Sequence, residues 1–359
     1  MFVPVNTNRK GFSLLELLVA VAVTAILAGM LFNITTQVMK TQTGSSADLE
    51  TNQVAQFVLD RIQEDLQCAV YQNDGNIWMA ADVLNTTENS TRWITADVPK
   101  PESNYSLRLL SEHWSKSSPE IEANGQGLLD ESRFGVAGTW LRFFTESPEV
   151  DPEAENSGGA RAVSYQIIRF GLTSSETSTP RYQLFRSDVS VANTFEAGYN
   201  LDPEKPNYST TGSNGPREAG NIVNPIFDKN GEPSTDFSVA ANIVDFGIRA
   251  YVFNKKPEGT SYLKQVFPDL NSTTDSFAYR ATSRPTFLNN TNKTLSQFPD
   301  VVDVMIRILT SEGESELSSF ERGLIPSQNG MSNDAAWWEI VERNSEVFVR
   351  RIKILSKGL

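Results

Sequence analysis

The sequence has almost none of the residues from which metal cages and histidine-dependent active sites are built. Its 359 residues include one cysteine, Cys68, and one histidine, His113. A single cysteine excludes an intrachain disulfide and a zinc site made of cysteines, and a single histidine excludes a histidine-rich metal site. No G-x-S-x-G turn that could supply a nucleophilic serine accompanies His113. We therefore expect His113 to be a surface residue and the protein not to be an enzyme.

Basic residues are also scarce. The chain has 31 Lys and Arg against 44 Asp and Glu, which gives a formal net charge of -13. A surface that binds nucleic acid needs a basic stripe, so this balance argues against nucleic acid as a partner. Hydrophobic residues make up 39% of the chain, which is enough for a buried core. The length predicts two modest domains or one domain with long insertions.

A long apolar run occupies the amino terminus. The 23 residues 12–34 contain a single charge, Glu16. As a helix they extend over about 34 Å, which is enough to cross a hydrocarbon core of about 30 Å. Arg9 and Lys10 lie just before the run, so we expect a single transmembrane helix with a cytoplasmic amino terminus and an extracytoplasmic body.

Two common types of apolar amino terminus do not account for this run. A secretory signal peptide has a shorter apolar stretch, and Ile26-Leu27-Ala28 is a poor cleavage site. A plain signal anchor has the right length but gives no reason for Glu16, because a carboxylate at mid-bilayer costs about 2.5–3.5 kcal/mol. The acid therefore calls for a different explanation.

The residues around Glu16 provide one. From Gly11 to Ala20 the chain reads GFSLLELLVA, which resembles the class III signal of type IV pilins and pseudopilins. In that family a prepilin peptidase cuts after the glycine on the cytoplasmic side and N-methylates the new first residue. The resemblance implies a cut between Gly11 and Phe12, methylation of Phe12, and an assembly role for Glu16 as the fifth residue of the mature chain. There Glu16 would pair with the Phe12 ammonium of a neighbouring subunit, so that two charges in lipid neutralise each other.

An amphipathic pattern follows the apolar run. Apolar residues at three- and four-residue spacing predict an amphipathic stalk helix over residues 35–71. The residues of this apolar stripe are Val54, Phe57, Val58, Ile62, Leu66, Ala69 and Val70. The charged residues Asp60, Arg61, Glu64 and Asp65 are expected to lie off this stripe. Weak helix formers at residues 41–46 predict a hinge. We expect Cys68 to be a small buried or half-buried residue of this helix.

The remaining residues, 72–359, carry β-type patterns. The predicted strands are 77–79, 92–95, 140–145, 162–170, 181–187, 243–253, 301–309 and 347–355. Residues 162–170 and 181–187 are predicted to form a hairpin, and residues 335–342 a short helix. In residues 301–309, Val302, Val304, Ile306 and Ile308 should share the buried face. Polar stretches at 85–90, 146–159, 193–238 and 254–299 are predicted to be long loops.

These patterns predict an α+β protein. A cleaved leader, residues 1–11, comes first. A long helix follows, with a transmembrane part at residues 12–34 and an amphipathic part at residues 35–71. An antiparallel β-sheet domain of the pilin type with long loop insertions comes after this helix. The hairpin of residues 163–167 with 184–186 and the Pro299-Asp300-Val301-Val302 segment are similar to J-type minor pseudopilins of type II secretion.

The resemblance implies a structural subunit of a type II secretion or type IV pilus-like assembly, held in the inner membrane with a periplasmic body. Its partners would be the prepilin peptidase and other pseudopilins or pilins. No cofactor is expected. A calcium loop at residues 228–232 remains an alternative to a plain Asn-Gly turn there. The alternative function is a signal-anchored extracytoplasmic binding protein or enzyme that uses its long loops.

Overall fold

The computed structural model describes residues 13–83, 139–146, 159–171, 180–189, 191–201, 237–267, 278–283, 295–327 and 333–355. The chain divides into two compact units, Met1–Glu50 and Thr51–Leu359. Among the described residues, the first unit is the amino-terminal part of helix α1. The second unit, which we call the body, holds the rest of α1 and all the described strands.

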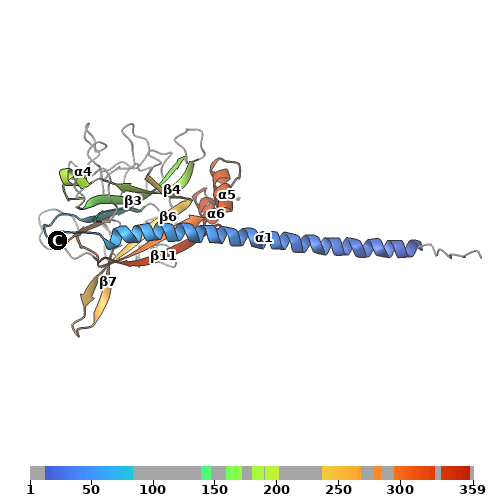
Figure 1. The fold of residues 1–359 in the computed structure, drawn as a ribbon, viewed down its shortest axis with the longest axis horizontal. Coiled ribbons are helices and arrows are strands. Elements are labelled where there is room, and N and C mark those ends of the chain that lie inside the picture. The colour runs from blue at the N-terminus through green and yellow to red at the C-terminus, as the bar shows by residue number, and fades with distance from the viewer. Residues whose placement is uncertain are drawn as a thin grey trace, which may run out of the picture. The chain divides into compact units, whose positions relative to one another are not determined.

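Helix α1 runs without a break from Leu14 to Gln67, over 54 residues (Figure 1). The break that weak helix formers predicted at residues 41–46 is absent, because the backbone there is helical. Extending a helix adds one hydrogen bond for each residue fixed, whereas starting one is costly. Two strongly helical flanks can therefore carry the helix through a short stretch of low propensity.

The larger sheet of the body has seven strands in the order β5-β4-β3-β2-β1-β8-β9. All its pairings are antiparallel except the parallel contact of β8 with β9. Its strands are β1 Met79–Val83, β2 Thr139–Thr145, β3 Arg161–Gly171, β4 Pro180–Asp188, β5 Ser238–Ala241, β8 Ala278–Thr282 and β9 Ser296–Gln297.

The smaller sheet has four antiparallel strands in the order β11-β10-β6-β7. They are β6 Ile243–Lys255, β7 Ser261–Phe267, β10 Val301–Leu309 and β11 Ser345–Lys353. Three short helices complete the described part of the body: α4 Val191–Ala197, α5 Ser311–Glu321 and α6 Asn333–Arg343.

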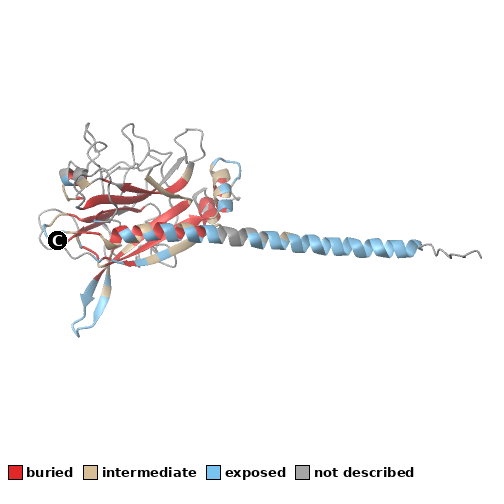
Figure 2. Ribbon diagram, in the orientation of Figure 1, coloured by how far each residue is buried: buried red, intermediate tan, exposed pale blue. Residues whose placement is uncertain are grey.

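The two sheets pack face to face around one apolar core (Figure 2). Tyr165 of β3 lies against Phe246 of β6, with ring centroids 6.3 Å apart. The chain crosses from one sheet to the other at Asn242, between β5 and β6. Asn242 has φ 64°, a left-handed conformation that asparagine tolerates better than most residues. Its backbone joins both sheets, because its N–H donates to the Tyr182 carbonyl and its carbonyl accepts from the Leu309 N–H.

The α+β class and the antiparallel arrangement are confirmed. The hairpin of β3 with β4 pairs as predicted, and Val302, Val304, Ile306 and Ile308 are all buried. Residues 92–95 lie outside the described part of the chain. The structure corrects three expectations: the strands form two sheets, residues 254–299 contain β7, β8 and β9 as well as loop, and α4 and α5 were not predicted. Short elements of mixed polarity, such as α5, give little periodic signal.

The apolar stripe of the stalk is confirmed in part. Val58, Ile62 and Leu66 are buried, but Phe57 is 61% exposed. Asp65, expected to lie off the stripe, is completely buried. The helical spacing itself places Asp65 inside, because it follows Ile62 by three residues. A buried carboxylate needs hydrogen-bond or charge partners, and those of Asp65 connect α1 to the larger sheet.

Candidate functional site

The predicted cleavage junction, Gly11 and Phe12, lies outside the described residues, which begin at Ser13. Ser13 caps the start of α1 together with Glu16. The Glu16 N–H donates to the Ser13 hydroxyl at 3.2 Å, and the Ser13 N–H donates to the Glu16 carboxylate at 3.0 Å. This reciprocal pair is a capping box, which satisfies two N–H groups that the first helical turn cannot bond internally.

The capping box places the one acid of the apolar run at the first turn of the helix. There a carboxylate faces the positive end of the helix dipole. The Glu16 carboxylate is therefore held at the amino-terminal end of the described helix.

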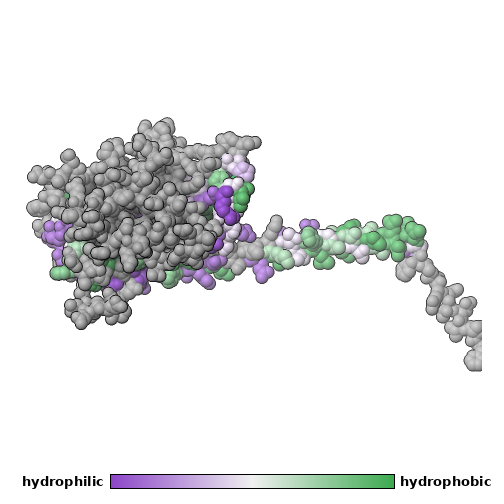
Figure 3. Space-filling model, turned by 90° about the horizontal axis from the view of Figure 1, so that it is seen from above, coloured by the Kyte–Doolittle hydropathy of each residue, from purple (hydrophilic) through white to green (hydrophobic). Residues whose placement is uncertain are grey.

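Behind the cap, residues Leu14–Met39 form the candidate membrane span, 26 residues with a mean hydropathy of 2.5. Figure 3 shows apolar side chains along this part of α1. Four polar side chains within it, those of Thr24, Asn33, Thr35 and Thr36, donate to carbonyls of the same helix. The Thr24 hydroxyl, for example, donates to the Ala20 carbonyl at 2.9 Å, and the Asn33 amide donates to the Gly29 carbonyl at 3.2 Å. These bonds meet the requirement that a membrane span satisfies its polar groups without water.

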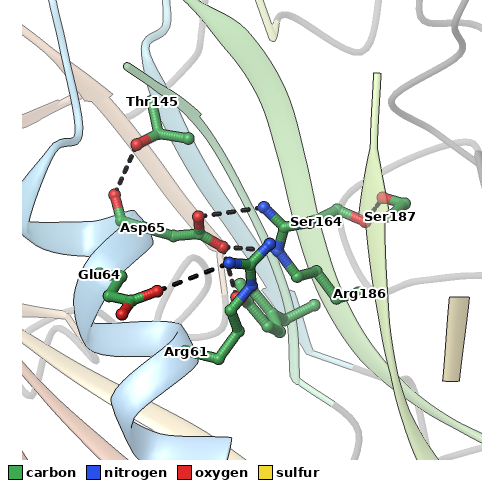
Figure 4. A network of polar contacts seen from close by, with 8 residues as sticks. Arg61, Glu64, Asp65, Thr145, Ser164, Arg186 and Ser187 are labelled. Carbon is green, nitrogen blue, oxygen red and sulfur yellow. Dashed lines mark hydrogen bonds and ion pairs between the residues drawn. The ribbon is translucent and has the colours of Figure 1, made fainter. Parts of the chain in front are cut away.

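In the body, Asp65 joins α1 to the larger sheet (Figure 4). Arg186 of β4 donates to both Asp65 carboxylate oxygens, from Nε at 2.7 Å and from Nη2 at 3.0 Å. The Tyr165 hydroxyl donates to Oδ2 at 2.5 Å. The Thr145 hydroxyl donates to the Asp65 backbone carbonyl at 2.7 Å. Because the Arg186 side chain is only 9% exposed and that of Asp65 is fully buried, each charge depends on the other for compensation.

Further contacts join the same helix to the smaller sheet. Arg350 of β11 pairs with Asp60, and the Leu355 N–H donates to the Gln67 carbonyl at 3.1 Å. The end of α1 is thus bonded to both sheets of the body.

We expect the body to lose stability as the pH rises above about 10. Burial raises the pKa of Tyr165 well above its usual value, and the Asp65 charge adds to this rise. Burial also raises the pKa of Tyr279, whose hydroxyl donates to the Gln297 carbonyl at 2.8 Å. A group whose pKa is higher in the folded state than in the unfolded state stabilises the fold at every pH below the unfolded-state pKa. This stabilisation is lost as the pH rises through the folded-state pKa.

The measurement is the unfolding midpoint of the full chain at about pH 9 and about pH 11. The midpoint should fall between these values, and Tyr165→Phe should make the fall smaller. An equal fall in the wild type and the variant would show that Tyr165 does not titrate with unfolding.

The remaining sequence candidates are not brought together by the described structure. His113 and the possible calcium loop at 228–232 lie outside the described residues. Within the described ranges, no group of three or more His, Cys, Asp or Glu side chains could hold a metal ion. Cys68 is half-buried, as expected, but it lies just after the end of α1 at Gln67 and is not part of the helix. Burial raises the pKa of its thiol, which disfavours the reactive thiolate.

Sequence reasoning missed Asp65 and its partners. The only available signal was the placement of an acid between apolar residues of one helical face, which indicates burial but not the partner. Arg186 follows Asp65 by 121 residues, and no local pattern relates the two.

Comparison with known proteins adds one finding about the amino terminus. Residues 6–32 match the model of the prokaryotic N-terminal methylation motif. No curated protein and no solved structure matches the chain. The match covers the predicted leader junction, the capping box and most of the apolar run. The chain therefore carries a class III signal of the type IV prepilin kind at its amino terminus.

Proposed function

We propose that the protein is a structural subunit, of the minor pseudopilin kind, of a type II secretion or type IV pilus-like assembly. The prepilin peptidase removes residues 1–11 and N-methylates Phe12. The observation that carries this proposal is the methylation motif at residues 6–32, which coincides with an apolar helix capped by Glu16. Type II secretion is one of the two systems proposed because residues 163–167, 184–186 and 299–302 resemble J-type minor pseudopilins in sequence.

The proposed sequence of events follows from the charges. Arg9 and Lys10 keep the leader on the cytoplasmic side while the apolar helix stays in the inner membrane. Cleavage removes these two cations and creates the Phe12 ammonium. This ammonium and the Glu16 carboxylate of an adjacent subunit neutralise each other, which favours lateral packing of the helices.

The body has a mechanical role in this proposal. It lies in the periplasm and is not an enzyme, and it needs no cofactor. The buried pair of Asp65 with Arg186 supports such a role, because a bidentate pair within the core fixes the orientation of α1 on the sheet. The partners are the prepilin peptidase and other pilin-like subunits that pack against the apolar helix.

The first test is the amino terminus of protein purified from its own host. Mass spectrometry should find a chain that begins at Phe12 and carries one added methyl group. Replacing Gly11 by a bulky residue such as Leu should leave the leader in place, because an extended backbone with a side chain there no longer fits the peptidase. A native chain that still begins at Met1, or one cut after Ala28, would contradict the proposal.

A further inference from the structure

Beyond α1, the described part of the body exposes one pair of adjacent large apolar side chains. Leu324 is 66% exposed and Ile325 is 38% exposed. They belong to residues 322–326, Arg-Gly-Leu-Ile-Pro, which we call the tip loop. All five residues are exposed, and Arg322 is the one charged residue among them. The other exposed large apolar residues of the described body beyond α1 have no such neighbour in the sequence.

The tip loop has a fixed backbone because it ends helix α5. The Gly323 N–H donates to the Phe320 carbonyl at 2.9 Å, and the Leu324 N–H donates to the Ser319 carbonyl at 2.9 Å. Gly323 has φ 73°, which glycine adopts without strain. These bonds form a Schellman motif, in which an apolar residue at the position of Leu324 frequently packs back on the helix. Here the Leu324 side chain is largely exposed instead.

Helices α5 and α6 run antiparallel, with the tip loop at one end of the pair. Asn344, just after α6, donates to Glu316 of α5 at 2.9 Å. Further along α5, Glu321 accepts from Trp337, nearer the start of α6, at 3.0 Å. The other end of the pair joins the smaller sheet, because the Thr310 N–H, just before α5, donates to the Asn344 carbonyl at 2.9 Å. The tip loop therefore lies at the end of the pair farther from β10 and β11.

The helix pair stands at the end of the body where α1 enters it. The Thr51 hydroxyl donates to the Glu346 carboxylate at 3.5 Å, and the Gln67 carbonyl accepts from the Leu355 N–H at 3.1 Å. Because the partners advance together along the two segments, β11 runs in the same direction as α1 and begins beside Thr51. Helix α6 ends just before β11. Figure 1 shows α5 and α6 at this end of the body.

The candidate membrane span ends a short distance before the body begins. The span is Leu14–Met39, and the body begins at Thr51. The backbone between them is helical, so Met39 and Thr51 are about 18 Å apart along the helix axis. The polar headgroup layer extends about 5–8 Å beyond the hydrocarbon core on each side of a bilayer. The end of the body that carries the tip loop is therefore held near a lipid surface.

The residue types of the tip loop suit that surface. Apolar side chains such as Leu324 and Ile325 gain free energy when they enter the boundary between lipid headgroups and acyl chains. A guanidinium group such as that of Arg322 forms charge-assisted hydrogen bonds with phosphate oxygens. The tip loop thus combines an apolar pair with a cation that matches the lipid phosphates.

The described acids of the helix pair are either bonded within the body or distant from the tip loop. Glu321, next to the loop, accepts from the Tyr182 hydroxyl at 2.6 Å. Glu312 and Glu342 are exposed, but both lie toward the Thr310 end of the pair. Three further acids pair with arginines, and they are Glu314, Glu316 and Glu339. None of these described acids stands in the way of a contact between the loop and lipid.

We propose that the tip loop enters the headgroup region of the bilayer that α1 crosses. Leu324 and Ile325 then lie toward the acyl chains, and Arg322 lies at the lipid phosphates. Two apolar side chains alone would bind a membrane weakly, but α1 already holds the body at the same surface, which raises the effective concentration of the loop there. The inference rests on the proposed function in one respect, that α1 spans the membrane. It does not depend on removal of the leader.

The test uses the full chain in vesicles of phosphatidylcholine with phosphatidylglycerol. Leu324→Cys carries a nitroxide label in a Cys68→Ser background, and electron paramagnetic resonance measures its collisions with oxygen, which concentrates in lipid, and with a water-soluble nickel chelate. We expect the label at position 324 to collide more with oxygen. The matched control is Phe195→Cys on α4, a 74% exposed site at the other end of the body (Figure 1), where nickel should dominate.

Two results would overturn the proposal. The first is a label at position 324 that the nickel chelate reaches as freely as it reaches the label at position 195, which would place the loop in water. The second is a label at position 324 that is shielded from both reagents, which would place the loop against protein.

An added charge provides a second measurement, with the label on Ile325→Cys. Leu324→Glu should lower the ratio of oxygen to nickel collisions about threefold or more, because a carboxylate resists entry into lipid. Ser315→Glu adds the same charge at an exposed position of α5 away from the loop and should leave the ratio unchanged. Equal falls in both variants, or no fall in either, would contradict the contact. The unfolding midpoint should stay the same, since Leu324 is largely exposed.

The two proposals fail in different ways. If the native chain begins at Phe12 but the label at position 324 lies in water, the lipid contact fails and the proposed function stands. If the native chain keeps its leader, the proposed function fails. The label then still decides whether the tip loop contacts lipid.

Discussion

Replacing Glu16 by alanine is expected to reduce incorporation of the chain into its assembly by about a hundredfold. The reason is that the Phe12 ammonium of a neighbouring subunit would lose its counter-charge in lipid, at a cost of about 2.5–3.5 kcal/mol. A difference of about 1.4 kcal/mol is a factor of ten in an equilibrium constant. The measurement is the ratio of processed chain in sheared or purified filaments to processed chain in the membrane.

Two variants separate the charge of Glu16 from its capping role. Glu16→Gln keeps an oxygen that can accept from the Ser13 N–H but removes the charge, and Ser13→Ala keeps the charge but removes the hydroxyl that accepts at 3.2 Å. If the charge matters for assembly, the Gln variant should fail like the Ala variant, and Ser13→Ala should assemble. The opposite result would assign Glu16 to helix capping alone. Leader removal should continue in all three variants.

Replacing Asp65 by alanine is expected to destabilise the body by about 3–5 kcal/mol. The variant leaves the Arg186 guanidinium buried without its carboxylate, and it removes the acceptor of the Tyr165 hydroxyl. Thermal or denaturant unfolding of the full chain in detergent measures the effect. In a body of this size a loss of 1 kcal/mol lowers the midpoint by about 2–4 °C, so a fall of about 6–20 °C is expected.

The control for Asp65 is Asp60, one and a half turns earlier on the same helix. Asp60 pairs with Arg350, but its side chain is 66% exposed, so Asp60→Ala should cost less than about 1 kcal/mol. The double variant Asp65→Leu with Arg186→Met should recover most of the lost stability, because it removes both buried charges. Similar losses for Asp60 and Asp65 would show that the buried pair does not anchor the helix.

Both predictions concern a carboxylate of helix α1, but the sequence pattern reveals the importance of only one of the two. Glu16 is conspicuous because a charge interrupts an apolar run, and the run itself needs no tertiary context to be recognised. Asp65 lies among ordinary amphipathic residues. The spacing from Ile62 indicates the buried face, but the charge suggests the opposite, and only the position of Arg186 in the fold resolves the conflict.

Several strands show the same division between local and distant information. The register of β3 with β4 follows from two alternating runs joined by a polar turn, so the hairpin was predictable. The grouping of strands into two sheets was not, because it depends on the left-handed turn at Asn242, which moves the chain from one sheet to the other. Strand β7 is exposed along much of its length and lacks the alternation that marks a half-buried strand.

The sequence by itself determined the amino-terminal signal, the membrane-length helix behind it and the α+β class, because each depends on residues close together in the chain. The tertiary structure alone decided how the end of α1 is fixed to the two sheets, where the chain changes sheet, and that β6 and β7 end in an exposed hairpin. The physical reason is the distance along the chain over which each interaction acts. Hydrophobic periodicity and capping act within a few residues, whereas buried charges, sheet order and surface charge distribution arise from residues that meet only after folding.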